Sequence, residues 1–250
     1  MAGIVQTIGA IFCNGFDLSA YLQSFSIDAN QDLKDKTNYA SGQAREFAVG
    51  LAERSFKAEG FLHYNAADDT LSQDKMFNDA IGSVTDHKLI SICTQGAVDV
   101  GDVAYIMNCI TAKYGTAPIK VGDLLQIMFE AKMSKQSGLA DFILGKWLMS
   151  QTVTGAVNGT SIDNGATSVG YVAQIHNTDS DGTLTGKVQH STDNSTWADL
   201  VTFGGAIAQN TAAQAINTAT TVNRYRRAII TAIGGTTNKA SIAFGSPYSG

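Results

Sequence analysis

The stretch VAYIMNCITAKYGTAPIKVGDLLQIMFEAKMS, residues 103–134, holds two runs of strand-forming residues separated by a segment rich in turn formers. It predicts two long strands, Val103–Tyr114 and Leu124–Ser134, joined by residues 115–123 into one large hairpin. Apolar and polar side chains alternate along the second strand, so each face meets a different environment. The apolar face holds Leu125, Ile127, Phe129, Ala131 and Met133, and the other holds Gln126, Glu130, Lys132 and Ser134 with Leu124 and Met128. One face can pack a core, while the other can meet water, a polyanion or a surface shared between subunits.

The composition is that of a globular chain with a mild negative charge. Its 250 residues suffice for one or two domains and a sizeable core. No apolar run is long enough to span a membrane and the first residues are not basic, so we expect a soluble protein without a secretory signal. The net charge of −5 arises in residues 1–148, which hold 12 Lys and Arg against 17 Asp and Glu, while residues 149–250 hold 5 of each kind. Such a chain could let nucleic acid pass but is a poor candidate for gripping it.

Local patterns predict strands along the whole chain and a single helix. In the first part we expect a tight turn at Asn14–Gly15, a helix over residues 70–82, and strands at 4–12, 24–28, 46–49, 55–64 and 88–94. The polar segment Asn30–Gly42 has almost no apolar anchor and is predicted to be an exposed loop. Beyond Trp147 we expect strands at Tyr171–His176, Thr185–Ser191, Leu200–Phe203, Gln214–Asn217, Arg224–Ile233 and Ser241–Phe244.

These elements predict a mainly β fold in two domains. The first, residues 1–148, is expected to be a β-sandwich with the long hairpin and the helix. A linker rich in Thr, Gly, Asn and Ser is expected at residues 149–165, followed by an all-β sandwich, immunoglobulin-like or similar, at residues 166–250.

The sequence offers no pattern of catalytic or metal-binding residues, so we expect neither an enzyme nor a cofactor. Cys13, Cys93 and Cys109 lack metal-site spacing and are predicted to be buried thiols of a reducing compartment. The four histidines are widely separated, and Asp179–Gly182 is predicted to be a turn because no acidic residue follows at the closing position of a calcium loop. The basic cluster Arg224–Arg227 is predicted to be a solvated or carboxylate-paired strand whose charges are divided between two faces.

An ordered series of short patterns in residues 4–148 resembles the major tail tube proteins of long-tailed bacteriophages with non-contractile tails. The series runs through residues 14–22, the alternating residues 24–27, residues 37–42 with Arg45, Gly50–Leu51, the strand with Gly60, the helix ending at Gly82, Gly101–Tyr105 and Val121–Asp123. Residues 183–245, with residues 187–191, 195–197 and 222–225, are similar to β-sandwich modules that many phage virion proteins append.

The resemblance implies a virion protein of the phage tail, assembled in the cytoplasm of the bacterial host. It implies hexameric rings stacked into a tube that encloses the tape measure protein, meets tail terminator and distal tail proteins, and later conducts the DNA. In that setting Gln126, Glu130, Lys132 and Ser134 are candidates for the lumen face. Candidates for contacts between rings are Lys34, Asp35, Lys36, Asn38 and Tyr39 in the polar segment.

Two other functions stay open at this point. The first is the tube of a contractile injection machine, against which the appended module argues, because a sheath must close around such a tube. The second is a carbohydrate-binding or adhesive β-sandwich, for which Trp197, Tyr171 and Tyr225 are the stacking candidates and a host-surface carbohydrate is the implied ligand.

Overall fold

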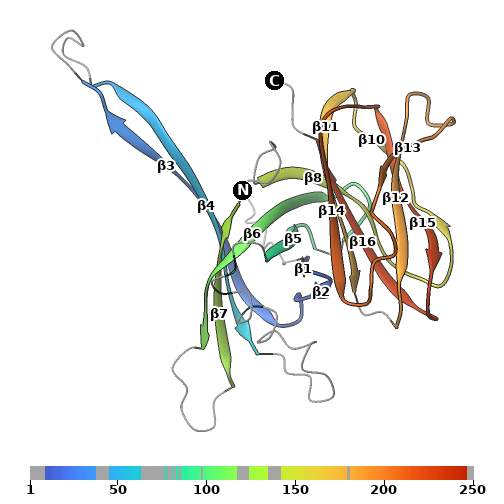
Figure 1. Cartoon of the computed structure of the whole chain (residues 1–250), viewed down its shortest axis with the longest axis horizontal. Helices are drawn as coiled ribbons and strands as arrows, with labels where there is room; N and C mark the ends of the chain where they lie inside the picture. Colours follow the sequence, from blue (N-terminus) through green and yellow to red (C-terminus); the bar gives the residue numbers. More distant parts are fainter. Residues whose placement is uncertain are drawn as a thin grey trace, which may run out of the picture. The chain divides into compact units, whose positions relative to one another are not determined.

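The computed structural model describes residues 9–37, 45–62, 77, 81, 83, 86–96, 98–116, 124–134, 142–178 and 181–246 (Figure 1). The fold is mainly β, as predicted, and every pairing between its strands that we describe is antiparallel. Most of the predicted helix lies outside the described residues, although Phe77 within it is helical. No helix among the described residues reaches the length and apolar character that crossing a membrane requires.

The chain forms two compact units. Unit 1 comprises residues 1–21, 87–109 and 134–250, and unit 2 comprises residues 22–86 and 110–133. The strands of unit 1 are β1 (Ala10–Cys13), β2 (Phe16–Asp17), β5 (His87–Cys93), β8 (Phe142–Val153), β9 (Val157–Asn158), β10 (Ile162–Asp163), β11 (Ser168–Thr178), β12 (Leu184–Ser191), β13 (Ala198–Thr202), β14 (Thr211–Val222), β15 (Tyr225–Ile233) and β16 (Asn238–Gly245). The strands of unit 2 are β3 (Leu22–Asp35), β4 (Phe47–Phe61) and β7 (Gln126–Met133), while β6 (Val103–Thr116) begins in unit 1 and ends in unit 2.

The bounds of these units differ from those of the predicted domains. The predicted linker, residues 149–165, contains the end of β8 and both short strands β9 and β10. Strand β8 pairs with β6 through residues 142–146 and with β16 through residues 146–153, so it joins the two predicted domains in one sheet. The predicted strands at 46–49 and 55–64 are one continuous strand, β4.

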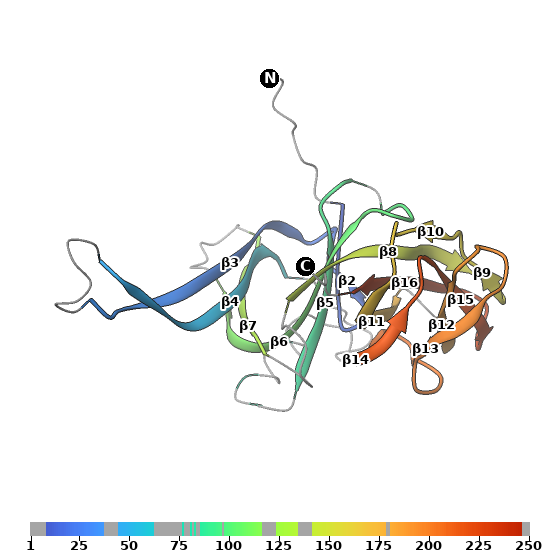
Figure 2. The ribbon, with the colours of Figure 1, turned by 90° about the horizontal axis from the view of Figure 1, so that it is seen from above.

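Unit 1 is a sandwich of two sheets. The larger has the order β14-β11-β16-β8-β6-β5-β1-β2, and the smaller has the order β10-β15-β12-β13 with β9 also paired to β15. Figures 1 and 2 both show β12, β13 and β15 as a second layer against β11, β14 and β16. Apolar residues from facing strands of the two sheets form the first core. Its buried members include Leu148 and Met149 of β8, Ala173 and Ile175 of β11, Val188 of β12, Ile230 of β15 and Ile242 of β16.

The larger sheet is also buried on its other face. A second core contains Phe12 of β1, Cys93 of β5, Trp147 of β8, Val172 of β11 and Ala243 of β16. Residues 171, 173 and 175 of β11 belong to the first core, whereas residue 172 belongs to the second, as the alternation of a strand requires. The sheet therefore bends until β1 and β5 cover the outer face of β11 and β16.

The turn between β1 and β2 has the conformation that its sequence predicts. Asn14 and Gly15 have φ values of 47° and 85°, and Cys13 pairs with Phe16 across the turn. A Cβ atom on Gly15 would lie 2.3 Å from the backbone nitrogen of Thr211, so the close approach to β14 also requires glycine. The three cysteines are buried thiols, as predicted.

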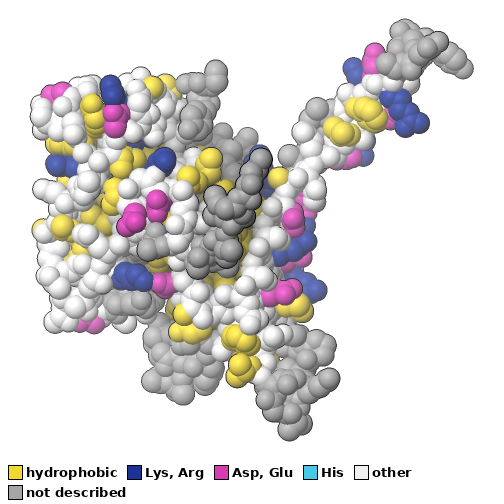
Figure 3. All heavy atoms as spheres, turned by 180° about the vertical axis from the view of Figure 1, so that it is seen from behind, with side chains coloured by type: hydrophobic (Ala, Val, Ile, Leu, Met, Phe, Trp, Pro, Cys, Tyr) yellow, Lys and Arg dark blue, Asp and Glu magenta, His cyan; other side chains and the backbone are white. Residues whose placement is uncertain are grey.

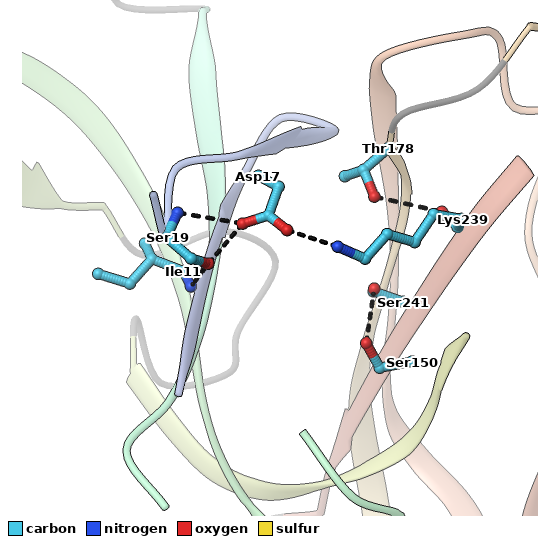
Figure 4. A network of polar contacts seen from close by, with 7 residues as sticks. All are labelled: Ile11, Asp17, Ser19, Ser150, Thr178, Lys239 and Ser241. Carbon is cyan, nitrogen blue, oxygen red and sulfur yellow. Dashed lines mark hydrogen bonds and ion pairs between the residues drawn. The ribbon is translucent and has the colours of Figure 1, made fainter. Parts of the chain in front are cut away.

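An ion pair ties β2 to the last strand (Figure 4). Lys239 Nζ of β16 lies 2.6 Å from Asp17 Oδ2, and Ser19 donates its hydroxyl and its backbone N–H to Asp17 Oδ1. Burial acts to raise the pKa of Asp17, but the hydrogen bonds from Lys239 and Ser19 outweigh it and the pKa is lowered. The ammonium group also lies 5.6 Å from the centre of the Phe12 ring. Residues 222 positions apart in the sequence are therefore joined at a half-buried site.

A chain of hydrogen bonds runs through the second core. Gly15 N–H donates to His176 Nδ1 at 3.2 Å, so His176 Nε2 carries the proton and donates to Ser91 Oγ at 3.1 Å. Ser91 Oγ donates to Gln174 Oε1 at 2.7 Å, and Gln174 Nε2 donates to the carbonyl of Met107 at 2.8 Å. Burial lowers the pKa of His176 to about 3, so the ring is neutral in the folded protein.

We expect truncation after Val153 to prevent folding of unit 1, because it removes β11 and β16 and exposes Trp147 and Phe12 of the second core. Size-exclusion chromatography and near-ultraviolet circular dichroism should report an aggregated chain without fixed aromatic packing. A truncated chain that stays monomeric and melts cooperatively would contradict this arrangement.

We expect His176 to make stability depend on pH. Its folded pKa of about 3 lies below its unfolded value of 6.5, so the unfolded chain takes up the proton first as the pH falls. The stability is then complete above pH 6.5 and declines towards pH 3 by about 1.4 kcal/mol per pH unit. Urea unfolding between pH 7 and about 4.5 should give a flatter profile for His176→Gln than for the wild type. His190→Gln, at a half-buried ring, should flatten the profile less, and equal slopes in all three proteins would refute the assignment.

Candidate assembly surface

Strands β3 and β4 of unit 2 continue as a two-stranded ribbon beyond their sheet (Figure 1). They pair from Leu22↔Gly60 to Asp35↔Phe47, whereas β7 pairs with β4 only between residues 55 and 61. Among the described residues, no third strand therefore supports the segments 29–35 and 47–54. We call these two segments the arm.

The arm corrects one prediction made from the sequence. The segment Asn30–Gly42 was expected to be a loop, yet residues 30–35 belong to β3 and pair with residues 47–53 of β4. The hydrogen bonds of a strand come from backbone pairing and do not depend on the side chains. A strand with water on both faces lacks the alternation of apolar and polar residues by which a strand is recognised in a sequence. Every residue from Ala29 to Asp35 is exposed.

The candidates for contacts between rings lie in and after the arm. Lys34 and Asp35 are in β3, Lys36 follows it, and Asn38 and Tyr39 lie outside the described residues. Lys34 Nζ lies 2.7 Å from Asp32, and Lys36 Nζ lies 3.5 Å from Glu46. Hydrogen bonds from Thr37 lower the pKa of Asp35. Figure 3 shows basic and acidic side chains following one another along this ribbon.

Among the described side chains of the arm, two large apolar ones are exposed to water. Leu33 is 56% exposed and Phe47 is 50% exposed. Phe47 pairs opposite Asp35, which is two residues from Leu33 on β3, so both apolar side chains belong to one face of the ribbon. Sequence reasoning missed them, although Leu33 is the single large apolar residue between Asn30 and Asp35.

The apolar face of β7 packs the core of unit 2, as the alternation predicted. Ile127, Phe129 and Ala131 are buried, whereas Gln126 is exposed. The Phe129 ring stacks on Phe77 at 4.2 Å between centroids and contacts Phe56 at 5.4 Å. The sequence therefore assigned the two faces of β7 correctly.

The opposite face of the sheet carries ion pairs across its strands. Lys132 of β7 pairs with Glu53 of β4 and with Glu130, whose carboxylate lies 3.4 Å away. The hydrogen bond from Lys132 lowers the pKa of Glu53, and the same bond raises the pKa of Lys132. Lys57, which faces Glu130 across the strands, lies 3.4 Å from Asp28. Gln126, Glu130 and Lys132 share this face, which we call the polar face; Ser134 falls in unit 1.

The polar face carries charges of both signs with a small excess of carboxylates. By register its carboxylates are Asp28, Glu53, Glu59 and Glu130 and its lysines are Lys57 and Lys132, while Lys113 of β6 lines a shallow cavity with Lys57, Glu59 and Glu130. A face of such composition presents no basic patch to hold phosphate and no purely acidic field to repel it. Whether it lines a lumen stays a prediction.

The candidates for carbohydrate stacking do not form a common surface. Tyr171 is buried in the first core of unit 1. Trp197 is covered by Arg227, whose Cζ lies 4.2 Å from the ring centre, and Arg224 lies 5.2 Å from the Tyr225 ring. These contacts leave no exposed aromatic platform shared by the three residues.

The basic cluster is only partly as expected. Arg224 binds Asp163 through two hydrogen bonds of 2.6 and 2.7 Å, as predicted for a carboxylate-paired residue, and they lower the pKa of Asp163 to about 2. Arg226 is instead 2% exposed. Asp181 accepts hydrogen bonds from Thr236 and Thr237 and lies in a bend with Gly182, while Asp179 and Ser180 of the predicted turn lie outside the described residues. No group of three metal-ligating side chains occurs in the part of the chain that the structure describes.

Comparisons with known proteins give only distant matches. No family model matches the chain, and no curated protein matches it. A chain of a native gene transfer agent virion covers 53% of this chain and 94% of its own length, at 16% identity and a TM-score of 0.36. The Dit protein of phage SPP1, described as a hub adsorption apparatus of phages that infect Gram-positive bacteria, covers 94% and 98% at 8% identity and a TM-score of 0.36. The phage p2 baseplate contains a chain that covers 96% and 98% at 9% identity and a TM-score of 0.31.

We expect the two faces of β7 to respond differently to mutation. Phe129→Ala should lower the free energy of unfolding by about 3–5 kcal/mol, because it empties the aromatic core of unit 2. Glu130→Gln, one residue away on the polar face, should change it by about 0.5 kcal/mol or less. Urea denaturation followed by circular dichroism measures both, and similar losses for the two variants would contradict the assignment of the faces.

Proposed function

We propose that this chain is a structural subunit of a bacteriophage tail that assembles with copies of itself into hexameric rings stacked as a tube. The observation that carries the proposal is the arm, which extends beyond the third strand of its sheet and exposes Leu33 and Phe47. The ordered sequence resemblance to tail tube proteins supports the part of the proposal that concerns rings and a tube.

The physical argument starts from the stability of the arm. A two-stranded ribbon is only marginally stable in water, since neither face is covered. Its outer edges also expose backbone hydrogen-bonding groups that favour pairing with another chain. A neighbouring copy that covers Leu33 and Phe47 would supply the missing support, and one such contact repeated around an axis closes a ring.

The polar face suits the wall of a conduit. Most of its charges are paired with one another, so DNA passing along its described residues would meet no basic groove. In the proposed tube this face encloses the tape measure protein and later conducts the genome. The ends of the tube would meet tail terminator and distal tail proteins in the virion.

Electron microscopy of the purified protein tests the proposal. Negative-stain images should show rings or tubes with a central channel. A protein that stays monomeric at high concentration, and is absent from phage tails, would refute the proposed function.

Replacement of the two exposed apolar residues tests the arm directly. Leu33→Ser with Phe47→Ser should abolish rings and tubes while the melting temperature of the monomer changes little, because each side chain is half exposed or more. Asn30→Ser is the matched control on the opposite face of the ribbon, where Asn30 pairs with Glu53, and it should assemble like the wild type. Normal tubes from the double variant would remove these residues from the assembly contact.

A further inference from the structure

Unit 1 contains a cavity of about 270 Å³ that the proposed assembly does not use. It lies where the starts of β6, β11 and β15 meet β8 and the end of β16. The residues that line it include Lys146, Asn164, Thr167, Ser168, Arg226 and Phe244. The volume is just below the range of about 300–1,000 Å³ typical of pockets for drug-sized ligands, so a smaller molecule fits best.

The cavity has the charge of an anion site. Among the described residues, its lining includes two cations, Lys146 and Arg226, and no carboxylate. Asp163, the neighbour of Asn164 in the sequence, is engaged by Arg224 and stays ionised there. Two positive groups in one cavity repel each other, and an anion between them would turn that repulsion into attraction.

Arg226 is fixed in place by its surroundings. The side chain is 2% exposed, its Nη2 donates to Ser168 Oγ at 3.0 Å, and its Cζ lies 5.2 Å from the Phe244 ring centre. Ser168 Oγ and Ser246 Oγ lie 2.5 Å apart, and Ser246 donates to the carbonyl of Gly170 at 2.6 Å. Arg226 therefore donates to Ser168, and Ser168 donates to Ser246. This series of hydrogen bonds holds the Arg226 guanidinium in one orientation.

Lys146 completes the charged wall from another strand. Its ammonium group donates to the carbonyl of Gly101 at 2.8 Å, which uses one of its three protons. Lys146 sits in β8, where it pairs in register with Val103 and Phe244, so backbone pairing holds it beside the cavity. Asn164 and Thr167 add an amide and a hydroxyl to the lining, and such groups suit a hydroxylated ligand.

We propose that this cavity binds a small oxyanion carried on a hydroxylated frame, such as the carboxylate of a sugar acid. Lys146 and Arg226 bind the oxyanion, and Asn164 and Thr167 contact the hydroxyl groups. The site is independent of the proposed assembly, because none of its lining residues belongs to the arm or to the polar face.

Calorimetric titration of the full chain with three probes tests the site. Glucuronate should bind at least about tenfold more tightly than glucose, which has the same ring without the carboxylate. Inorganic phosphate distinguishes a free anion from a sugar acid as the ligand. If phosphate binds more weakly than glucuronate, the result supports the sugar acid. If phosphate binds more tightly, the result overturns the sugar acid in favour of a free anion. No binding of either anion, or equal binding of glucose and glucuronate, would overturn the site.

Two substitutions test whether the anion binds in this cavity, and they distinguish a loss of binding from a loss of folding. Lys146→Gln removes one charge from the cavity and should weaken glucuronate binding about tenfold, while the protein keeps its circular dichroism spectrum. Lys187→Gln removes the same charge from β12, where Lys187 pairs with Asp199 outside the cavity, and should change the affinity by about twofold at most. Equal losses in the two variants would mean that overall charge, and not this cavity, attracts the anion.

Discussion

The burial of β11 on both faces is the constraint on which unit 1 depends. From Gly170 to Thr178 every residue of this strand is buried, although the segment includes Gln174, His176, Asn177 and Thr178. Burying polar groups costs free energy unless each finds a partner, and Gln174, His176 and Thr178 find theirs on segments far away in the sequence. His176 binds Gly15 and Ser91, and Gln174 binds Met107. The polar residues of β11 thus specify which strands cover its outer face.

The same constraint explains why the domain bounds differ from those that the sequence predicts. Composition changes near residue 148 because the charged residues become fewer, and such a change is an ordinary sign of a linker. Pairing between strands is not visible in composition. Strand β8 crosses the predicted bound, and its Trp147 packs against Phe12 at 5.5 Å while Leu148 faces the first core. A strand shared by two cores cannot act as a flexible connection.

Local rules predicted much of the secondary structure and little of the tertiary contacts. The turn at Asn14–Gly15, the two faces of β7 and the six strands after Trp147 follow from turn chemistry and from the period of two. The arm could not be predicted in this way, because a ribbon exposed on both faces has the composition of a loop. Arg226 shows the second limit: its sequence neighbours suggest a solvated cluster, yet the Phe244 ring and Ser168 that bury it come from other strands.

Different interactions stabilise the two units, and this difference matters for the proposed assembly. In unit 1 two apolar cores, a buried hydrogen-bond chain and the Lys239–Asp17 pair act together, so local opening of one strand disrupts several contacts at once. In unit 2 the base of β3 and β4 is held by the Phe56, Phe77 and Phe129 cluster, whereas the contacts described for the arm are backbone pairing, hydrogen bonds and exposed ion pairs. Less apolar burial therefore offsets the conformational entropy of fixing the arm than offsets that of the base. In an isolated copy the arm would have low stability. Burial of Leu33 and Phe47 by a neighbouring copy would supply free energy that orders the arm. In the proposed assembly, ordering of the arm and association of subunits would therefore be coupled.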